Sequence, residues 1–340
     1  MPAFEIHERH LAPAALVRVS RDAAPGDERR APGRIHVAPP GALDPDLLQH
    51  SHWGIMTRPD RAPGLSTVAR AMPERTTRTH LRIAAIGDLH VSKHSQGTLQ
   101  PLFSQISEDA DVLLLCGDFT DYGLPDEARV LARELTAAMK VPVIAVLGNH
   151  DYEGGKPQEI REILSDAGVT VLDGEATELH GVGFAGVKGF AGGFGRGALG
   201  PWGEHAIKAF VQEAVDEALK LEAALARLRT QQRVALLHYS PVRATVEGEP
   251  PDIFAYLGSS RLEEPINRYR VSAVFHGHAH RGTPEGRTST GIPVHNVAMP
   301  LLMRTNPNRP PFLVVEMPFD AAAAGGAAAE PRRKPLVKSA

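Results

Sequence analysis

Five short polar blocks, each directly after a run of apolar residues, constrain what this chain can fold into. The apolar runs span residues 83–86, 112–116, 143–147, 234–237 and 271–275, and their length and composition are typical of buried strands. The blocks after them are Gly87-Asp88-Leu89-His90, Gly117-Asp118-Phe119-Thr120-Asp121, Gly148-Asn149-His150-Asp151, His238, and Gly277-His278-Ala279-His280. Because open α/β sheets place their sites at the carboxyl ends of strands, we expect these side chains to meet at one edge.

The residue types in these blocks favour a site for two divalent metal ions. Hydrolysis of a phosphate ester at neutral pH needs an activated water and a counter-charge for the phosphoryl oxygens, and two ions roughly 3.5–4 Å apart supply both. A bridging carboxylate, further carboxylate and imidazole ligands, and an amide are all present. A lone Asp or His after a strand is usually only a loop residue, but five such blocks in one chain favour a two-metal hydrolase.

In their order along the chain, the blocks resemble the pattern of the calcineurin-like metallophosphoesterases. That pattern is Asp-x-His, Gly-Asp-x-x-Asp, Gly-Asn-His-Asp/Glu, a later His and Gly-His-x-His, and the match spans Leu81 to about Met317. The resemblance implies an α/β architecture in which two mixed β-sheets are flanked by helices in a four-layer αββα sandwich. It also implies hydrolysis of a phosphate ester by a metal-bridged hydroxide.

Carried over residue by residue, the resemblance implies a set of metal ligands. The first ion would be held by Asp88, His90 and His280, the bridge would be Asp118, and the second ion would be held by Asn149, His238 and His278. The cofactors would be two divalent ions, Mn, Fe or Zn, among which nitrogen and oxygen ligands do not decide.

The resemblance also implies that His150 is the general acid that protonates the leaving oxygen. Its orienting partner is predicted to be Asp121, with Asp151 as the alternative. His94, His276 and His295 fit no element of the ligand pattern, so we interpret them as loop or structural residues.

The predicted substrate is a small phosphodiester or phosphomonoester. The Ser/Thr protein phosphatases carry Asp-Arg-Gly where this chain has Asp121-Tyr122-Gly123, which disfavours that branch. Cyclic-nucleotide phosphodiesterase-like members often have a second His at the position of Tyr239. Its absence weakens the assignment as a phosphodiesterase but does not exclude it. Two alternatives remain open, a nuclease of the same superfamily and a non-catalytic metal-binding scaffold. A net charge of −3 without a basic stripe argues against nucleic acid as a partner.

Composition divides the chain into three parts. Residues 1–78, rich in Pro, Arg and His, are predicted to be largely disordered, residues 79–318 to form the catalytic domain, and residues 319–340 to be a disordered Ala/Gly-rich tail. Translation starting at Met72 is a separate hypothesis. The single Cys116 has no partner for an internal disulfide, and no apolar run approaches the roughly 20 residues of a membrane span. We therefore predict a cytoplasmic protein that contacts no membrane, with its oligomeric state open.

Four helices are predicted, over residues 98–108, 125–139, 157–167 and 204–228. The Gly-rich stretch 181–203 lies before the last of them and has two interpretations. It is either a flexible loop or a lid over the metals that carries Lys188, Phe190, Phe194, Arg196 and Trp202.

Overall fold

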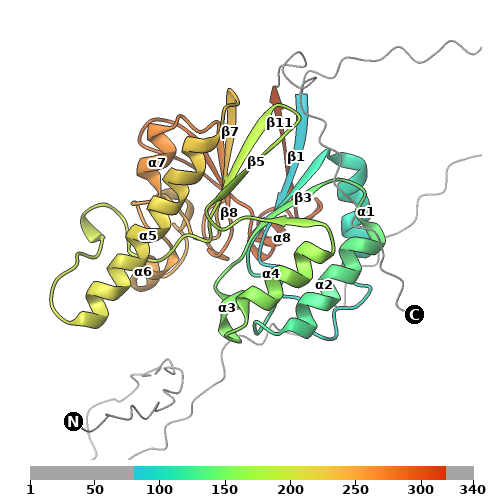
Figure 1. Ribbon diagram of the computed structural model, residues 1–340, viewed down its shortest axis with the longest axis horizontal. Coiled ribbons are helices and arrows are strands. Elements are labelled where there is room, and N and C mark those ends of the chain that lie inside the picture. Colours follow the sequence, from blue (N-terminus) through green and yellow to red (C-terminus); the bar gives the residue numbers. More distant parts are fainter. Residues whose placement is uncertain (1–79, 319–340) are drawn as a thin grey trace, which may run out of the picture. The chain divides into compact units, whose positions relative to one another are not determined.

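The computed structural model describes residues 80–318, and within them the strands form two mixed sheets (Figure 1). The first sheet has the order β11-β1-β2-β3-β4. Its strands are β1 (His80–Ile86), β2 (Val112–Cys116), β3 (Val143–Val146), β4 (Val169–Val171) and β11 (Leu313–Pro318). Strands β1 to β4 are parallel, and β11 pairs with β1 in the antiparallel sense. The predictions for residues 1–78 and 319–340 lie outside the described residues.

The second sheet has the order β5-β6-β7-β8-β10-β9. Its strands are β5 (Glu175–Leu179), β6 (Val182–Gly186), β7 (Gln232–Leu236), β8 (Ala273–His276), β9 (Glu285–Arg287) and β10 (Pro293–Asn296). The four inner strands are parallel, whereas the edge strands β5 and β9 run antiparallel to their neighbours. Each sheet therefore directs the carboxyl ends of several strands to a single edge.

Helices cover the outer face of each sheet, as Figure 1 shows. The first sheet packs against α1 (Gln100–Asp109), α2 (Pro125–Ala138) and α4 (Pro157–Asp166), and the second against α5 (His205–Arg227) and α7 (Glu263–Arg268). Short helices α3 (His150–Glu153), α6 (Phe254–Leu257) and α8 (Met299–Thr305) and the 3₁₀ turns η2 (Gly195–Gly197), η3 (Arg243–Thr245) and η4 (Pro251–Ile253) lie in the connections. The four long helices lie close to their predicted bounds.

Local sequence explains where these helices begin and end. A proline opens both α2 and α4, where its missing N–H costs nothing. Asp126 and Glu127 in the first turn of α2 complement the helix dipole. Gly168 follows α4 with φ +92°, a conformation that glycine adopts without steric cost.

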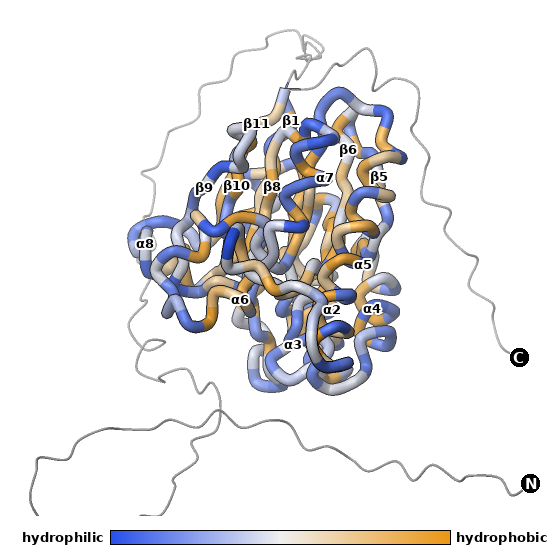
Figure 2. Tube along the Cα trace, turned by 90° about the vertical axis from the view of Figure 1, so that its left-hand side faces the viewer, coloured by the Kyte–Doolittle hydropathy of each residue, from blue (hydrophilic) through white to orange (hydrophobic). Residues whose placement is uncertain are grey.

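Alternating side chains on the strands build the layers of the core. In β1, Ile83 and Ala85 pack between the two sheets, while Ala84 and Ile86 pack against the helices. Phe275 of β8 meets the first set from the opposite sheet and is fully buried. Each such large side chain contributes about 1.5–3 kcal/mol by leaving water. Figure 2 shows the apolar strands inside and hydrophilic residues on the outer helices, which confirms the predicted four-layer sandwich.

Two further predictions concern Cys116 and the membrane. Cys116 lies fully buried in β2 as a free thiol. Among residues 80–318, no helix is both long and apolar enough to cross a bilayer.

Candidate metal centre

The five polar blocks meet at the carboxyl ends of β1, β2, β3, β7 and β8, and glycines allow the close approach. A Cβ on Gly148 would collide with the Asp118 carboxylate, and a Cβ on Gly277 would collide with the Asp88 carboxylate. The position of Gly117 is restricted in the same way by the ring of His238. A glycine before a ligand residue therefore reflects packing of the site as well as turn geometry.

Four of the predicted ligands have a left-handed backbone conformation, which is unusual for non-glycine residues. They are Asp88 (φ 58°), His90 (φ 44°), Asp118 (φ 50°) and His278 (φ 70°). Each such residue costs on the order of 1–3 kcal/mol, and residues of this kind concentrate at functional sites. These unfavourable backbone conformations persist because the surrounding sheets fix them, which is typical of a functional site.

The first predicted half-site consists of Asp88, His90 and His280. One ligand atom from each lies within 4.8 Å of the others. Asp88 is fully buried, accepts the backbone N–H of His278 at 2.9 and 3.0 Å, and lies 3.0 Å from His280 Nε2. Burial opposes ionisation of Asp88, but the charge of His280 and its hydrogen bond to the carboxylate lower the pKa of Asp88 overall. Burial lowers the pKa of His90 to about 4, which leaves this ring neutral at pH 7.

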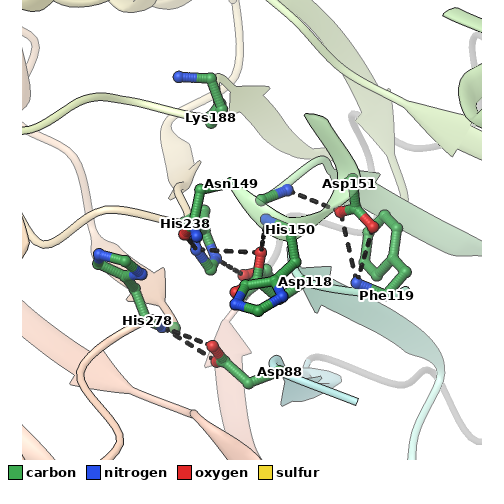
Figure 3. A network of polar contacts seen from close by, with 12 residues as sticks. Asp88, Asp118, Phe119, Asn149, His150, Asp151, Lys188, His238 and His278 are labelled. Carbon is green, nitrogen blue, oxygen red and sulfur yellow. Dashed lines mark hydrogen bonds and ion pairs between the residues drawn. The ribbon is translucent and has the colours of Figure 1, made fainter. Parts of the chain in front are cut away.

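The second predicted half-site consists of Asp118, Asn149, His238 and His278. Ligand atoms of Asp118, His238 and His278 lie within 4.8 Å of one another. His238 Nε2 lies 2.8 Å from Asn149 Oδ1 and 3.4 Å from Asp118 Oδ1 (Figure 3). Burial lowers the pKa of His278 to about 4 and that of His238 well below its ordinary value.

Main-chain carbonyls select which nitrogen of these two rings faces the centre. The Nδ1–H of His238 donates to Cys116 O at 2.9 Å, and the Nε2–H of His278 donates to Tyr256 O at 3.1 Å. A carbonyl only accepts, so the other nitrogen of each neutral ring carries the lone pair. Such outer partners orient imidazole ligands in metal sites.

Carboxylate, amide and ring atoms that can act as acceptors therefore converge in this centre, and a cation resolves that arrangement. His238 Nε2 turns its lone pair toward Asn149 Oδ1 and Asp118 Oδ1. His90 Nε2 is buried with no hydrogen-bond partner and lies 3.9 Å from Asp118 Oδ2. Burial and then the charge of Asp88 raise the pKa of Asp118 well above its ordinary range. The donor set of carboxylates, imidazoles and an amide fits divalent first-row ions.

His150 lies at the accessible side of this centre. Its side chain is 34 % exposed, and its ring meets that of His90 edge-on with centroids 4.6 Å apart. The Nδ1–H donates to the backbone carbonyl of Asp121 at 2.7 Å. The Asp121 carboxylate faces His90 instead, with 3.7 Å between Oδ1 and Nδ1. The contact expected from the Asp121 side chain is thus made by its main chain, because the turn after β2 directs the carbonyl toward the ring.

Asp151, the alternative partner for His150, points away from it. Its carboxylate is fully buried and accepts the N–H groups of Phe119, Thr120 and Gly148 at 2.8 to 3.3 Å, together with the Thr120 hydroxyl at 2.8 Å (Figure 3). These bonds join the block after β2 to the block after β3. Nothing in the order of residues distinguishes this structural role from a catalytic one.

The remaining histidines lie as follows. His94 is exposed in a loop. His276 is fully buried, with Nε2 2.8 Å from the Thr245 hydroxyl and Nδ1 2.8 Å from Gly277 O. His295 stacks on Phe275 with ring centroids 5.2 Å apart. None of the three belongs to a group of potential metal ligands among residues 80–318.

The Gly-rich stretch is tied to the segment around α6 by backbone hydrogen bonds. Gly192 N–H donates to Ala255 O and Gly193 N–H to Gly258 O, both at 2.8 Å. Trp202 is 68 % exposed, whereas Lys188 is 8 % exposed. The stretch is therefore neither a free loop nor a uniform lid, because its first residues belong to the protein interior.

Comparison with known proteins agrees with this geometry. Residues 81–282 match the family described as calcineurin-like phosphoesterase. Among curated proteins, none matches the chain. The crystal structure of phosphopantetheinyl hydrolase from Mycobacterium tuberculosis is 16% identical with a TM-score of 0.52, over 76% of this chain and 99% of that one. At this identity the likeness concerns the fold.

Two further solved structures are more distant. A putative 5'-nucleotidase from Staphylococcus aureus is 16% identical with a TM-score of 0.40, over 64% of this chain and 48% of that one. The protein TT1561 of Thermus thermophilus is 15% identical with a TM-score of 0.43, over 71% of this chain and 99% of that one. The family match covers most of the described chain and includes the blocks that form the polar edge, so the protein belongs to the calcineurin-like phosphoesterase family, metal-dependent hydrolases of phosphoester bonds.

Proposed function

We propose that the chain hydrolyses a small phosphodiester or phosphomonoester with two divalent ions. The observation that supports this most directly is the convergence of His90, Asp118 and His238. Nε2 of His90 has no hydrogen-bond partner and lies 3.9 Å from the Asp118 carboxylate, and Nε2 of His238 lies 3.4 Å from it. Asp88, His90 and His280 would hold one ion, Asn149, His238 and His278 the other, and Asp118 would contact both. Bound there, Mn, Fe or Zn ions would supply an acidic water and positive charge for the phosphoryl oxygens.

His150 is the proton donor in this proposal. Since Nδ1–H is held by the carbonyl of Asp121, Nε2 is the nitrogen that takes up and releases the proton. Its partly exposed ring lies beside His90, where an ester oxygen leaving the centre comes within reach. A positioned acid of this kind contributes about 10²–10⁴-fold to the rate.

The test compares hydrolysis of bis-p-nitrophenyl phosphate and p-nitrophenyl phosphate with added Mn²⁺. For Asp118→Asn we expect kcat/KM to fall by about 10³-fold or more, because charge stabilisation of several kcal/mol is lost. The His150→Ala variant is expected to lose about 10²–10⁴-fold in kcat while it keeps both metal ions. The exposed His94→Ala variant is the matched control and should match the wild type.

Metal content measured on the same samples separates the two roles. Hydrolysis of the diester would point to a phosphodiesterase, and hydrolysis of the monoester alone to a phosphatase. A wild type that binds two ions and cleaves neither ester would favour the non-catalytic scaffold and count against this proposal.

A further inference from the structure

Lys188 occupies an unusual position beside the metal centre. It lies two residues beyond the end of β6, and its carbonyl accepts the N–H groups of His238 at 3.0 Å and Tyr239 at 3.1 Å. In Figure 3 the Lys188 side chain extends away from Asn149 and His238, so its backbone is the part that contacts the centre. These bonds hold the Lys188 backbone directly against a predicted metal ligand.

An aromatic cage explains how a lysine is accommodated there. The Nζ atom lies 5.4 Å from the ring centroid of Tyr152, 4.9 Å from that of Phe190 and 5.3 Å from that of Tyr239. Ring faces attract an ammonium group, and the attraction grows when water is excluded. The rings stabilise the charge of Lys188, but they do not neutralise it.

Within residues 80–318, Lys188 forms no ion pair with a carboxylate. Its Nζ donates to the adjacent carbonyl of Gly189 at 2.7 Å. The buried Glu217 is paired with Lys220 at 2.6 Å and accepts the N–H of Gly189, and Asp173 is also paired with Lys220, at 3.3 Å. Burial lowers the pKa of Lys188, while Glu217 and Glu213 oppose that shift from a distance. Buried cations in proteins are normally paired, so Lys188 lacks a direct counter-ion.

Lys188 also lines a pocket next to α3, the short helix that begins at His150. The pocket has a volume of about 100 Å³, and its polar lining consists of Tyr152, Gln158, Arg161, Asp173 and Lys188. Tyr152 belongs to the same one-turn helix, α3, as His150. Arg161 is already bound to Glu175 at 2.7 Å. Lys188 is therefore the cation in the pocket that an incoming anion meets without a competing ion pair.

We infer that Lys188 binds an anionic group carried by the leaving portion of the substrate. The inference rests on the proposed function and specifies its substrate class, a phosphate ester whose leaving alcohol carries a phosphate or a carboxylate. His150 protonates the leaving oxygen, and the chain beyond that oxygen passes α3 into the pocket. Lys188 acts in specificity, on a part of the substrate distant from the scissile bond.

The test uses paired probes that differ only in the terminal anion. Propyl, butyl, pentyl and hexyl phosphates are compared with the same alkyl phosphates that carry a terminal phosphate or a terminal carboxylate. Each is measured as an inhibitor of bis-p-nitrophenyl phosphate hydrolysis with free Mn²⁺ held constant. For the wild type we expect at least one terminal anion to tighten inhibition about tenfold or more, and the best chain length reports the spacing.

Three variants identify the residue responsible. Lys188→Met should remove the preference for the terminal anion, and this loss should exceed any change in kcat for bis-p-nitrophenyl phosphate, since that diester has no second anion. Lys188→Arg should keep much of the preference. Lys156→Met removes a 59 % exposed lysine next to the proline that lines the same pocket and should behave as the wild type, which excludes a general charge effect.

Other outcomes would overturn the inference. A fall in kcat on every ester for Lys188→Met would place the ammonium on the scissile phosphoryl group. If Lys188→Met lowers Tm but keeps the preference for probes with a terminal anion, the role of Lys188 is to balance the charge of Glu217 in the folded protein. The shift in Tm of the metal-loaded protein on adding each probe measures binding without turnover. It therefore shows whether Lys188 binds the terminal anion even if no ester is cleaved, which separates failure of this inference from failure of the proposed function.

Discussion

Asp118 and Asp151 are two buried carboxylates of neighbouring blocks, and their surroundings are opposite in kind. Asp151 accepts hydrogen bonds from three backbone N–H groups and a hydroxyl. Asp118 accepts one backbone N–H, from His150 at 2.8 Å, and otherwise faces imidazole nitrogens. Both pKa values are raised by burial, but that of Asp151 is held down by its donors, whereas the charge of Asp88 raises that of Asp118 further.

This difference separates a carboxylate that serves the fold from one left available for a ligand. The bonds of Asp151 are complete without a cation, so its role is to join two loops. Asp118 is under-satisfied in a place where water is excluded, which is costly unless a cation binds. The comparison can be tested by removing each carboxylate in turn.

The largest effect on stability is expected for Asp151→Ala. The N–H groups of Phe119, Thr120 and Gly148 would be left buried and unpaired, at about 1–3 kcal/mol each. We expect the free energy of unfolding to fall by about 3–5 kcal/mol, measured by urea denaturation of the metal-free protein. Asp126→Ala, which removes an exposed acid on α2, is the control and should change it by less than about 1 kcal/mol. A loss for Asp151→Ala no greater than the control's would show that the two loops hold without this carboxylate.

In the metal-free protein, Asp118→Asn is expected to increase stability, whereas Asp151→Ala decreases it. The folded-state pKa of Asp118 is raised, so the stability from this group is present below the unfolded-state pKa and is lost as pH rises through the folded-state value. Near neutral pH the neutral Asn is therefore expected to raise Tm by about 2–4 °C. Added Mn²⁺ should reverse the order, because only the wild type gains a well-bound ion. If Asp118→Asn is less stable than the wild type in the absence of metal, then Asp118 stabilises the fold as Asp151 does, and the proposed difference between the two carboxylates is wrong.

A small effect is expected for Asp121→Asn. The carbonyl of Asp121, which the substitution keeps, holds His150, and the side chain lies 3.7 Å from His90 Nδ1. We expect kcat to change by less than about tenfold, below the roughly 10²-fold that a lost proton donor causes, with an unchanged pH profile. A loss as large as that of His150→Ala, with a shifted profile, would show that the carboxylate orients His150 during turnover.

Much of the fold was predictable because its signals are local. Continuous apolar runs indicated the buried strands, and prolines and acidic first turns marked α2 and α4. The order of the polar blocks predicted the family and the sandwich, both confirmed. Strand β11 pairs with β1 from more than two hundred positions away, and no local pattern indicated that pairing.

The residues of the centre were predictable as a group, whereas their individual contacts were not. Blocks after parallel strands lie at the carboxyl edge of their own sheet. The packing of the two sheets then brings all seven predicted ligands together. The choice between Asp121 and Asp151 depended on which way each side chain points after a sharp turn. Tyr256 orients His278 through its backbone carbonyl, and a contact made by the main chain cannot be predicted from the residue type.

By itself, the sequence determined which chemical groups this protein brings to the ends of its strands, since strand period and block order are local properties. Only the tertiary structure decided which of those groups lack a partner. Asp151 is fully hydrogen-bonded, Asp118 accepts only one backbone N–H, and Nε2 of His90 has no partner. Lys188 is caged by aromatic rings from three separate segments rather than carried on a lid. The physical reason is that hydrogen-bond and charge satisfaction depend on neighbours distant in the chain, and folding alone sets those neighbours.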